Sequence, residues 1–464
     1  MKGDFSRVTF DHFKHYSQVL TQQGRVQLDA DENERQAIFL HQVRTLTRDL
    51  IGHHAGPSAA CGFAITADGT SLANFKIGPG RYYVDGFLCE NDKESGYTAQ
   101  PDWLPAQPDW WPNDDEQLSR LFDNTSTDIL LVYLDVWEHF VNAVQDETIV
   151  EKALNGPDTA ARAKTVWQVK VLAKQTDGND LPSGLTCVGA GPIFDAWIAQ
   201  QSMDRRGKLR VKVQKAAAVT DPCITPPDAG YRGAENQLYR VEIHTGGKAG
   251  QATYKWSREN GSVVARWLDT DGNNLILDST RGFAEGQWVE LLDDTKELRG
   301  EPGTLVKLAK VEGGAITIDP PTASGSINRA DFPRHPRVRR WDQHGTERTR
   351  LAADKAIPLT EGKDANTWVE LEDGIVLQFQ ENASNPYVYR TGDYWLIPAR
   401  VATGKVDWCQ DAKTNEPMAL PPHGIEHHYA PLAILAVVAN DGTNRLNPTS
   451  CRNQIKSDVF IESV

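Results

Sequence analysis

The sequence predicts a mainly β protein, built from several small antiparallel sandwich or barrel domains and preceded by a helical N-terminal docking segment. After residue 60, strand-like runs follow one another at a spacing of roughly ten residues, with turn-forming Gly, Asn and Asp between them. No helical periodicity alternates with these runs, which disfavours a parallel α/β enzyme fold. Only the first 55 residues differ, because there an aromatic arm precedes one helical pattern.

The arm, residues 1–24, contains no apolar run that could serve as a signal peptide, because charged residues interrupt it throughout. Its aromatic side chains are too apolar for a solvated tail, so a surface must cover them. That surface is either the protein's own core or a neighbouring subunit. We expect the arm to be an assembly element, with interface residues Phe5, Phe10, Phe13 and Tyr16.

One amphipathic helix is predicted over residues 31–50. Asp31 and Glu34 have the spacing of a capping box, and Gly52 follows where a helix end commonly needs a left-handed residue. Apolar residues recur at intervals of four, three and four, which places them on one face of the helix. These residues are Phe39, Val43, Leu46 and Leu50.

The strand pattern divides the remainder into a β domain (56–245), a small β-barrel-like domain (246–330) and a C-terminal β domain (331–464), after an arm-and-helix region (1–55). The clearest strand, LLVYLDVWEHF (130–140), is a continuous apolar run typical of a buried strand. TVWQVKVLA (165–173) and LYRVEIH (238–244) instead alternate apolar and polar residues. Residues 97–128 form a long loop rich in Pro, Asp and Trp, in which we expect Trp110 and Trp111 to pack at an interface.

The net charge of −14 argues against nucleic acid as the main partner. No run approaches the ~20 apolar residues of a membrane helix, so we expect no membrane insertion and a cytoplasmic location when the protein is made.

Two basic features stand out, a strand with Lys208, Arg210 and Lys212 and a Pro-broken loop at 332–344. A solvated face is the simpler interpretation, and docking onto an acidic neighbour is the alternative. The loop residues proposed for that interface are Arg337, Arg339 and Arg340, and their complement is the acidic stretch with Asp109, Asp114, Asp115 and Glu116.

Two stretches resemble metal sites, although a turn explains each of them better. DTDGNN (269–274) begins like a calcium loop through Asp269, Asp271 and Asn273, but Thr280 stands where such a loop needs Glu, which favours a hairpin tip. PPHGIEHHYAP (421–431) does not have the HExxH spacing, and its prolines prevent a helix, which favours a proline-framed turn. Its candidate ligands are His423, Glu426, His427 and His428.

No nucleophile elbow, P-loop or dinucleotide fingerprint is present, so we expect neither enzymatic activity nor a cofactor. The six cysteines form no CxxC pair, which disfavours a zinc cluster. Inside a cell they are expected to be reduced, and disulfides after release stay an open alternative.

Several phrases of the chain resemble a widespread bacterial family associated with phage-tail-like particles, especially extracellular contractile injection systems. Besides MKGDFSRVTF…QQGRVQLDADENE (1–34), they include IGPGRYYVDGFLCEN (77–91), NGPDTAARAKTVWQVKV (155–171) and PPHGIEHHYAPLA (421–433). The resemblance implies a structural accessory subunit near the baseplate, spike or fibres, which self-associates and contacts other particle subunits. The particle is then released outside the cell. The alternatives are a fibre-like or lectin-like module that stacks sugars on Trp and, third, a glycoside hydrolase, because carboxylates are abundant.

Overall fold

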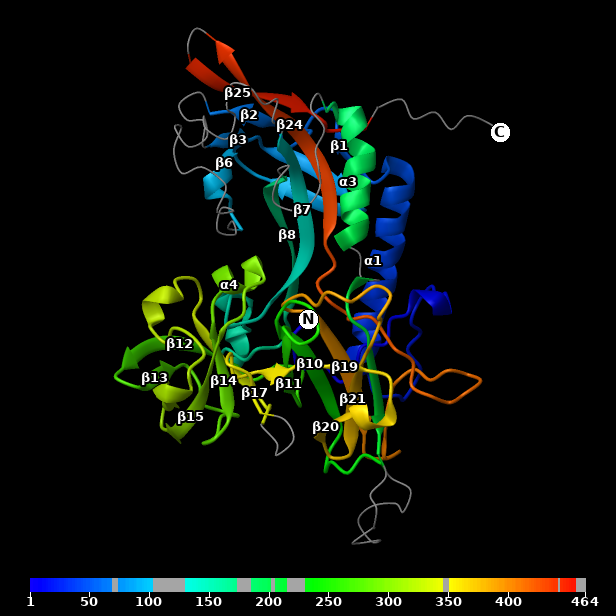
Figure 1. The fold of residues 1–464 in the computed structure, drawn as a ribbon, viewed down its shortest axis with the longest axis vertical. Helices are drawn as coiled ribbons and strands as arrows, with labels where there is room; N and C mark the ends of the chain where they lie inside the picture. Colours follow the sequence, from blue (N-terminus) through cyan, green and yellow to red (C-terminus); the bar gives the residue numbers. More distant parts are fainter. Residues whose placement is uncertain are drawn as a thin grey trace.

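The computed structural model describes residues 1–68, 74–102, 130–172, 185–201, 205–214, 230–344, 350–440 and 443–455. Within these residues, six sheets form three lobes, which we call the upper lobe, the barrel and the lower lobe (Figure 1). Trp267, Trp341 and Trp395 are among the largest fully buried side chains. The mainly β fold class predicted from the sequence is confirmed.

The upper lobe consists of three small sheets that share one apolar core. In its largest sheet, with the order β25–β24–β7–β8, the C-terminal β24 pairs with β7 along the buried apolar run predicted as a strand. The strands of the lobe are β1 (His54–Pro57), β2 (Ile65–Ala67), β3 (Phe75–Ile77), β4 (Gly80–Val84), β5 (Phe87–Asn91), β6 (Ser95–Gly96), β7 (Leu130–Val141), β8 (Arg162–Leu172), β24 (His428–Asn440), β25 (Thr443–Ser450) and β26 (Gln454–Ile455).

The barrel is a closed sheet with the strand order β12–β13–β16–β15–β14–β17. Apolar residues of all six strands fill its interior, with Phe332 against Trp267. Its elements are β12 (Val264–Asp271), β13 (Asn274–Leu277), β14 (Trp288–Leu292), α4 (Asp294–Arg299), β15 (Thr304–Glu312), β16 (Ala315–Asp319) and β17 (Arg337–Trp341).

The lower lobe packs two sheets around an aromatic-rich core. One sheet has the order β18–β11–β10–β22–β23, and in the other β21 pairs with β9, β19 and β20. The strands are β9 (Leu209–Val213), β10 (Gln237–Thr245), β11 (Thr253–Ser257), β18 (Ile357–Pro358), β19 (Glu361–Gly362), β20 (Val369–Glu372), β21 (Ile375–Gln380), β22 (Tyr394–Arg400) and β23 (Lys405–Val406).

The lobes do not coincide with the boundaries expected at 246 and 331. The barrel takes its last strand, β17, from beyond residue 331. Each of the other two lobes combines strands from both sides of the barrel in the sequence, as in the pairs β7–β24 and β10–β22. Long-range strand pairing therefore joins segments that the sequence pattern assigns to separate regions.

Helix α1 spans Asp29–Ile51, so it begins before the predicted capping box. Leu28 is the N-cap and its side chain makes no capping hydrogen bond, which corrects the role assigned to Asp31 and Glu34. Asp29, Asp31 and Glu32 in the first turn instead favour the helix through its dipole. Gly52 ends the helix as predicted, with a φ of 87°.

A second long helix, α3 (Cys187–Gln201), lies within the region expected to be a β domain (56–245), where the sequence pattern did not indicate a helix. Its Phe194 and Trp197 pack on Tyr133 of β7, with ring centroids 5.7 and 5.1 Å away. A disulfide joins Cys187 to Cys451 and fixes the start of α3 beside the end of β25. No helix in the described part of the chain is long and apolar enough to cross a membrane.

Candidate functional site

The three lobes meet around the first residues of the chain (Figure 1). The Met1 carbonyl oxygen accepts hydrogen bonds from Arg240 at 3.2 Å and from Asn260 at 3.1 Å, and Asn260 also donates to the Gly3 carbonyl at 2.9 Å. The Met1 α-amine donates to the hydroxyl of Tyr394, and burial holds the pKa of this amine well below its ordinary value. The backbone at the start of the arm is thus held by residues of the protein's own body, although Met1 is 38% exposed.

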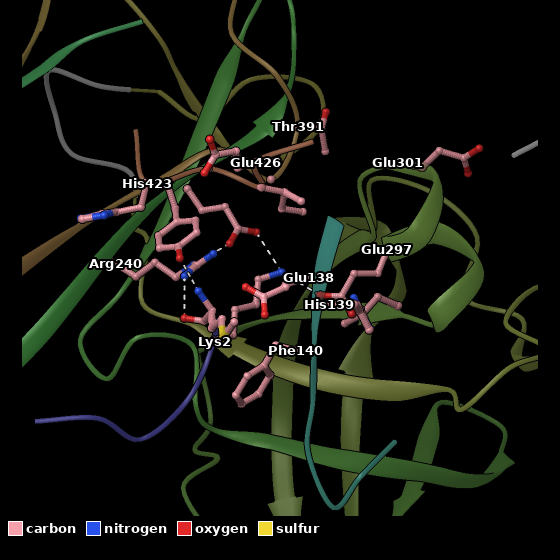
Figure 2. Close-up of a pocket in the computed structure, with 18 of the residues that line it drawn as sticks. Lys2, Glu138, His139, Phe140, Arg240, Glu297, Glu301, Thr391, His423 and Glu426 are labelled. Carbon is pink, nitrogen blue, oxygen red and sulfur yellow. Dashed lines mark hydrogen bonds and ion pairs between the residues drawn. The ribbon is translucent and has the colours of Figure 1, made fainter. Parts of the chain in front are cut away.

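Lys2 connects the lower lobe to the barrel, as Figure 2 shows. Its Nζ lies 3.2 Å from a carboxylate oxygen of Glu242 on β10 and 3.2 Å from one of Glu297 on α4. Burial alone would raise the pKa of Glu242, but Lys2 and Arg240 outweigh that effect and lower it well below its ordinary value. The ammonium group therefore compensates two carboxylates that would otherwise be buried without sufficient positive charge.

A second ionic contact lies deeper in the same junction. Lys255 of β11 contacts Glu290 of β14 at 2.5 Å and Glu242 at 3.5 Å. The indole of Trp341 donates to Glu290 at 2.8 Å. Burial opposes ionisation of Glu290, yet Lys255 and His244 lower its pKa to about 2. Lys2 and Lys255 together make the junction an ionic network that orients the barrel on the lower lobe.

The prediction that Arg337, Arg339 and Arg340 form a basic docking loop is wrong, because all three are buried in strand β17. Arg337 has no exposed side-chain surface and binds Asp294 at 2.6 Å together with Glu297. Arg339 donates to the Gly261 carbonyl. Arg340 lies 3.4 Å from Asp342 and also contacts Glu259. These side chains are structural, and their proposed acidic complement at 109–116 lies outside the described residues.

The other basic feature, strand β9, has the alternation that the sequence predicts. Leu209 and Val211 are buried, whereas Lys208, Arg210 and Lys212 are half-buried. The Lys212 ammonium lies 4.2 Å from the centroid of the Trp368 ring.

Within the described residues, one group of side chains has the proximity that a metal site requires, namely His139, Asp294 and Glu297. Their candidate ligand atoms lie within 4.8 Å of one another. Arg337 binds both carboxylates, and Lys2 binds Glu297, so cations of the chain already compensate their charge. A metal ion would have to displace these contacts and lie beside a buried guanidinium, which electrostatics opposes.

The candidate ligands of the His-rich turn do not converge on one site, because each contacts a different part of the protein. His427 Nδ1 lies 2.6 Å from Asp135, which also binds Lys170 at 2.6 Å. His428 Nδ1 lies 3.1 Å from Asp85. His423 is exposed, and its backbone N–H donates to the Tyr394 carbonyl at 2.7 Å. Glu426 is exposed at the rim of the cavity beside the junction.

The DTDGNN stretch forms the predicted hairpin tip between β12 and β13. Asp271 pairs with Asn274, and Gly272 has the positive φ of 59° that the turn requires. Asp269 belongs to β12 and is exposed.

The four proposed arm residues divide into two pairs. Phe5 packs in its own chain, edge-to-face with Phe140 at 6.2 Å and against Leu238 and Leu396. Phe10 lies 5.7 Å from the His41 ring on α1. Phe13 and Tyr16 are exposed, as are most residues of the segment 11–28. Trp110 and Trp111 lie outside the described residues.

Helix α1 rests on the body through few contacts and bridges a cavity of about 670 Å³. Only Ala30 and Ile38 of α1 are buried. Arg44 holds the helix, since it binds Glu138 at 2.7 Å and lies 3.8 Å over the Phe87 ring. At Gly86 the two backbones approach so closely that a Cβ atom there would lie 2.4 Å from the Arg44 carbonyl oxygen.

The outer face of α1 bears the apolar stripe predicted from the sequence, and this stripe is uncovered. Phe39, Val43, Leu46 and Leu50 are 60%, 41%, 60% and 69% exposed. Of the 19 exposed large hydrophobic side chains in the described residues, 12 lie within the first 50 positions. Together with the exposed segment 11–28, this stripe is the candidate functional surface, and we call it the N-terminal docking surface.

The described tryptophans, by contrast, offer no sugar-stacking platform. Seven of them are buried, and Trp288, Trp368 and Trp408 are half-buried. An exposed row of Trp side chains, which a lectin-like surface requires, is therefore not found in the described part of the chain.

The junction was not predicted, because its charged residues come from strands β10, β11 and β14, from helix α4 and from the second residue of the chain. The alternation Arg240–Glu242 in LYRVEIH was visible, but it is typical of a solvated strand face.

No match is found among curated proteins or among solved structures. A family model described as "Family of unknown function (DUF6519)" matches residues 1–188 and 175–457, which together cover nearly the whole chain. The chain therefore belongs to the DUF6519 family, a family of unknown function.

Proposed function

We propose that this protein is a structural assembly subunit that binds its neighbours through the N-terminal docking surface. The observation that carries the proposal is the concentration of exposed apolar side chains in the first 50 residues. A soluble monomer rarely leaves large contiguous apolar patches uncovered, and such patches mark interaction sites. The half-buried anchors at Phe5 and Phe10 support this role, because they hold the exposed segment in a defined place.

The proposed setting is a contractile injection system or related phage-tail-like particle, close to the baseplate, spike or fibres. This part of the proposal is supported by the sequence phrases quoted above. In this setting the protein associates with itself and with other particle subunits. It performs no catalysis and needs no cofactor, and it reaches the outside of the cell as part of the released particle.

Two other functions make different predictions. A lectin-like module would need accessible Trp side chains, and a glycoside hydrolase would need two carboxylates facing an open groove. Three carboxylates of the junction are already paired with Lys or Arg side chains of the same chain, namely Glu242, Glu290 and Glu297. These contacts favour the structural role over both alternatives.

The test replaces three exposed arm residues together, Phe13→Ser, Tyr16→Ser and Leu20→Ser. These residues contribute little to the body, because each is more than half exposed. Particles would be purified from producing cells, and the amount of this protein per particle measured by quantitative mass spectrometry. We expect at least a roughly tenfold loss, since burial of such side chains normally dominates interface energy.

The matched control is Leu268→Ser with Val388→Ser, which removes exposed apolar side chains outside the first 50 residues. Normal incorporation of the triple variant would refute docking through the arm. Absence of the unmodified protein from every such particle would refute the proposed setting. Specific binding to a glycan array, abolished by substitution of one Trp, would favour the lectin-like function instead.

A further inference from the structure

We infer that the outer face of α1 pairs with α1 of a second copy of this chain, antiparallel and around a two-fold axis. The inference rests on the proposed function and names the partner for one part of its surface. The four residues concerned are spaced 4-3-4 along the helix, which is the spacing of a two-stranded helical seam. The opposite face of α1, with Ala30, Ala37 and Arg44, lines the cavity toward the body. Helix α1 lies at the outside of the molecule (Figure 1), and the stripe lies on the face of the helix opposite this cavity.

The stripe is complementary to itself in the antiparallel direction. If the axis passes between Val43 and Leu46, Val43 lies against Leu46 of the partner subunit, and Phe39 lies against Leu50 of the partner subunit. Each large side chain then meets another apolar one, as a two-fold interface requires. The antiparallel direction also places the dipoles of the two helices in the favourable orientation.

The charge of residues 1–50 is compatible with contact between two copies of the chain. The chain carries a net charge of −14, so two copies that meet through an average surface repel each other. Residues 1–50 are an exception, because they contain seven Lys and Arg and seven Asp and Glu. Their net charge is zero, and no charged residue belongs to the stripe itself. At physiological ionic strength charges interact mainly within about 8 Å, so two copies that meet through the N-terminal docking surface face little local repulsion.

The extent of the surface fits a pair of copies. At 1.5 Å per residue, the 23 residues of α1 extend about 34 Å. The apolar area continues from the helix onto the body, because Leu40 and Val43 line a hollow together with Leu88, which is itself exposed. The exposed segment 11–28 adds further apolar contacts on the arm side.

The direction of the pair can be tested by disulfide crosslinking of the purified full-length protein. The background carries Cys61→Ser, Cys223→Ser and Cys409→Ser. Cys61 and Cys409 are free thiols that are not fully buried, and Cys223 lies outside the described residues. Proteins with Phe39→Cys and with Leu50→Cys are oxidised separately and as a mixture, with a mass tag on one of them. In the antiparallel pair, position 39 faces position 50 of the other copy, while the two copies of position 39 are about 16 Å apart along the axis. A disulfide needs Cα atoms within about 7 Å.

We therefore expect crosslinked dimer in the mixture and little in either protein alone. Crosslinking of each variant with itself would overturn the antiparallel arrangement. Crosslinking at the same level from Leu268→Cys, an exposed position outside the first 50 residues, would show random collision and would also overturn the inference.

The second measurement is the dimer dissociation constant, obtained by sedimentation equilibrium. Leu46→Glu introduces a charge into the centre of the seam, and we expect the dissociation constant to rise by at least about tenfold. Leu154→Glu is the matched control, because Leu154 is 66% exposed and lies outside the docking surface. A protein that stays monomeric up to about 100 µM, or a dimer that Leu46→Glu leaves unchanged, would overturn the inference.

The same measurements can show that the outer face of α1 binds something other than a second copy. If the protein is monomeric and sediments with anionic phospholipid vesicles, and if Leu46→Glu abolishes this sedimentation, the face binds a membrane surface instead. A monomeric protein whose incorporation into particles depends on Phe13, Tyr16 and Leu20 would refute the pairing but leave the proposed function standing. The two proposals thus fail separately.

Discussion

Replacement of Arg337 by Met should destabilise the protein more than any change of an exposed ion pair. The guanidinium has no exposed side-chain surface and binds Asp294 at 2.6 Å as well as Glu297. Burial lowers its pKa, but these two carboxylates outweigh burial and raise it, so the charge is retained in the fold. Met keeps the apolar stem of the side chain and lacks the guanidinium group. The substitution therefore removes mainly the charge and its hydrogen bonds.

The loss in the free energy of unfolding depends on which partners Asp294 and Glu297 keep in the variant. Removing one partner of a buried ion pair leaves an uncompensated charge and costs about 3–5 kcal/mol. Asp294 keeps Gln145 at 3.1 Å and also His335 as hydrogen-bond partners, and Glu297 keeps Lys2 at 3.2 Å. We therefore expect a loss near the lower end, about 3 kcal/mol in the free energy of unfolding at pH 7. The control Lys310→Met breaks an exposed pair of the same barrel, with Glu312 at 2.7 Å, and should cost less than about 1 kcal/mol.

The assay is denaturant unfolding followed by tryptophan fluorescence at several pH values. Burial alone would raise the pKa of Asp294 and Glu297, but Arg337 lowers the pKa of Asp294 below its ordinary 3.8, and Lys2 together with Arg337 lowers that of Glu297 below 4.5. Their stabilising contribution is therefore present above about pH 4.5 and is lost as the pH falls through the lowered values. The difference between the two proteins should shrink from pH 5 to pH 3. Equal losses for Arg337→Met and Lys310→Met, or a difference independent of pH, would refute this reasoning.

Three further predictions concern other parts of the molecule. Cys187→Ser opens the disulfide and should lower the free energy of unfolding by about 2–5 kcal/mol; a reductant should have the same effect on the unmodified protein and none on the variant. Glu290 has a folded pKa of about 2 against an ordinary 4.5, so its contribution is present above pH 4.5 and is lost between pH 4.5 and 2; Glu290→Gln should flatten the stability profile in that range, and an unchanged profile would contradict this. Zinc at equimolar concentration should not raise the melting temperature through His139, Asp294 and Glu297, and elemental analysis that finds one bound metal per chain, lost in His139→Ala, would contradict the ionic role assigned to them.

The elements predicted best from the sequence are those defined by local pattern. The buried run of β7, the alternating strand β10, the hairpin tip at Gly272 and the end of α1 at Gly52 each depend on residues close in the chain. Such signals act through periodicity and turn chemistry, which a single sequence displays directly.

The elements missed are those that depend on tertiary contacts. Helix α3 contains Gly189, Gly191 and Pro192, which weaken a helix in isolation, and it is stabilised by Phe194 and Trp197 packing on β7. The run RVRRW was interpreted as an exposed basic loop, because three acidic partners of its arginines, Glu259, Asp294 and Glu297, are distant in the sequence. The same limit hid the junction, where Lys2 meets residues 242 and 297.

The interleaving of the chain has a consequence for synthesis on the ribosome. The barrel is assembled from one continuous segment, β12 to β17, so it can close as soon as residue 341 has emerged. β10 must wait for β22. β7 must wait for β24, whose paired residues follow 292 to 305 positions later in the sequence. Until then, β7 can pair with β8, but its other edge lacks β24, and unpaired strand edges of this kind are prone to aggregation. Folding of the two outer lobes should therefore be post-translational, with the barrel as the first native body to form.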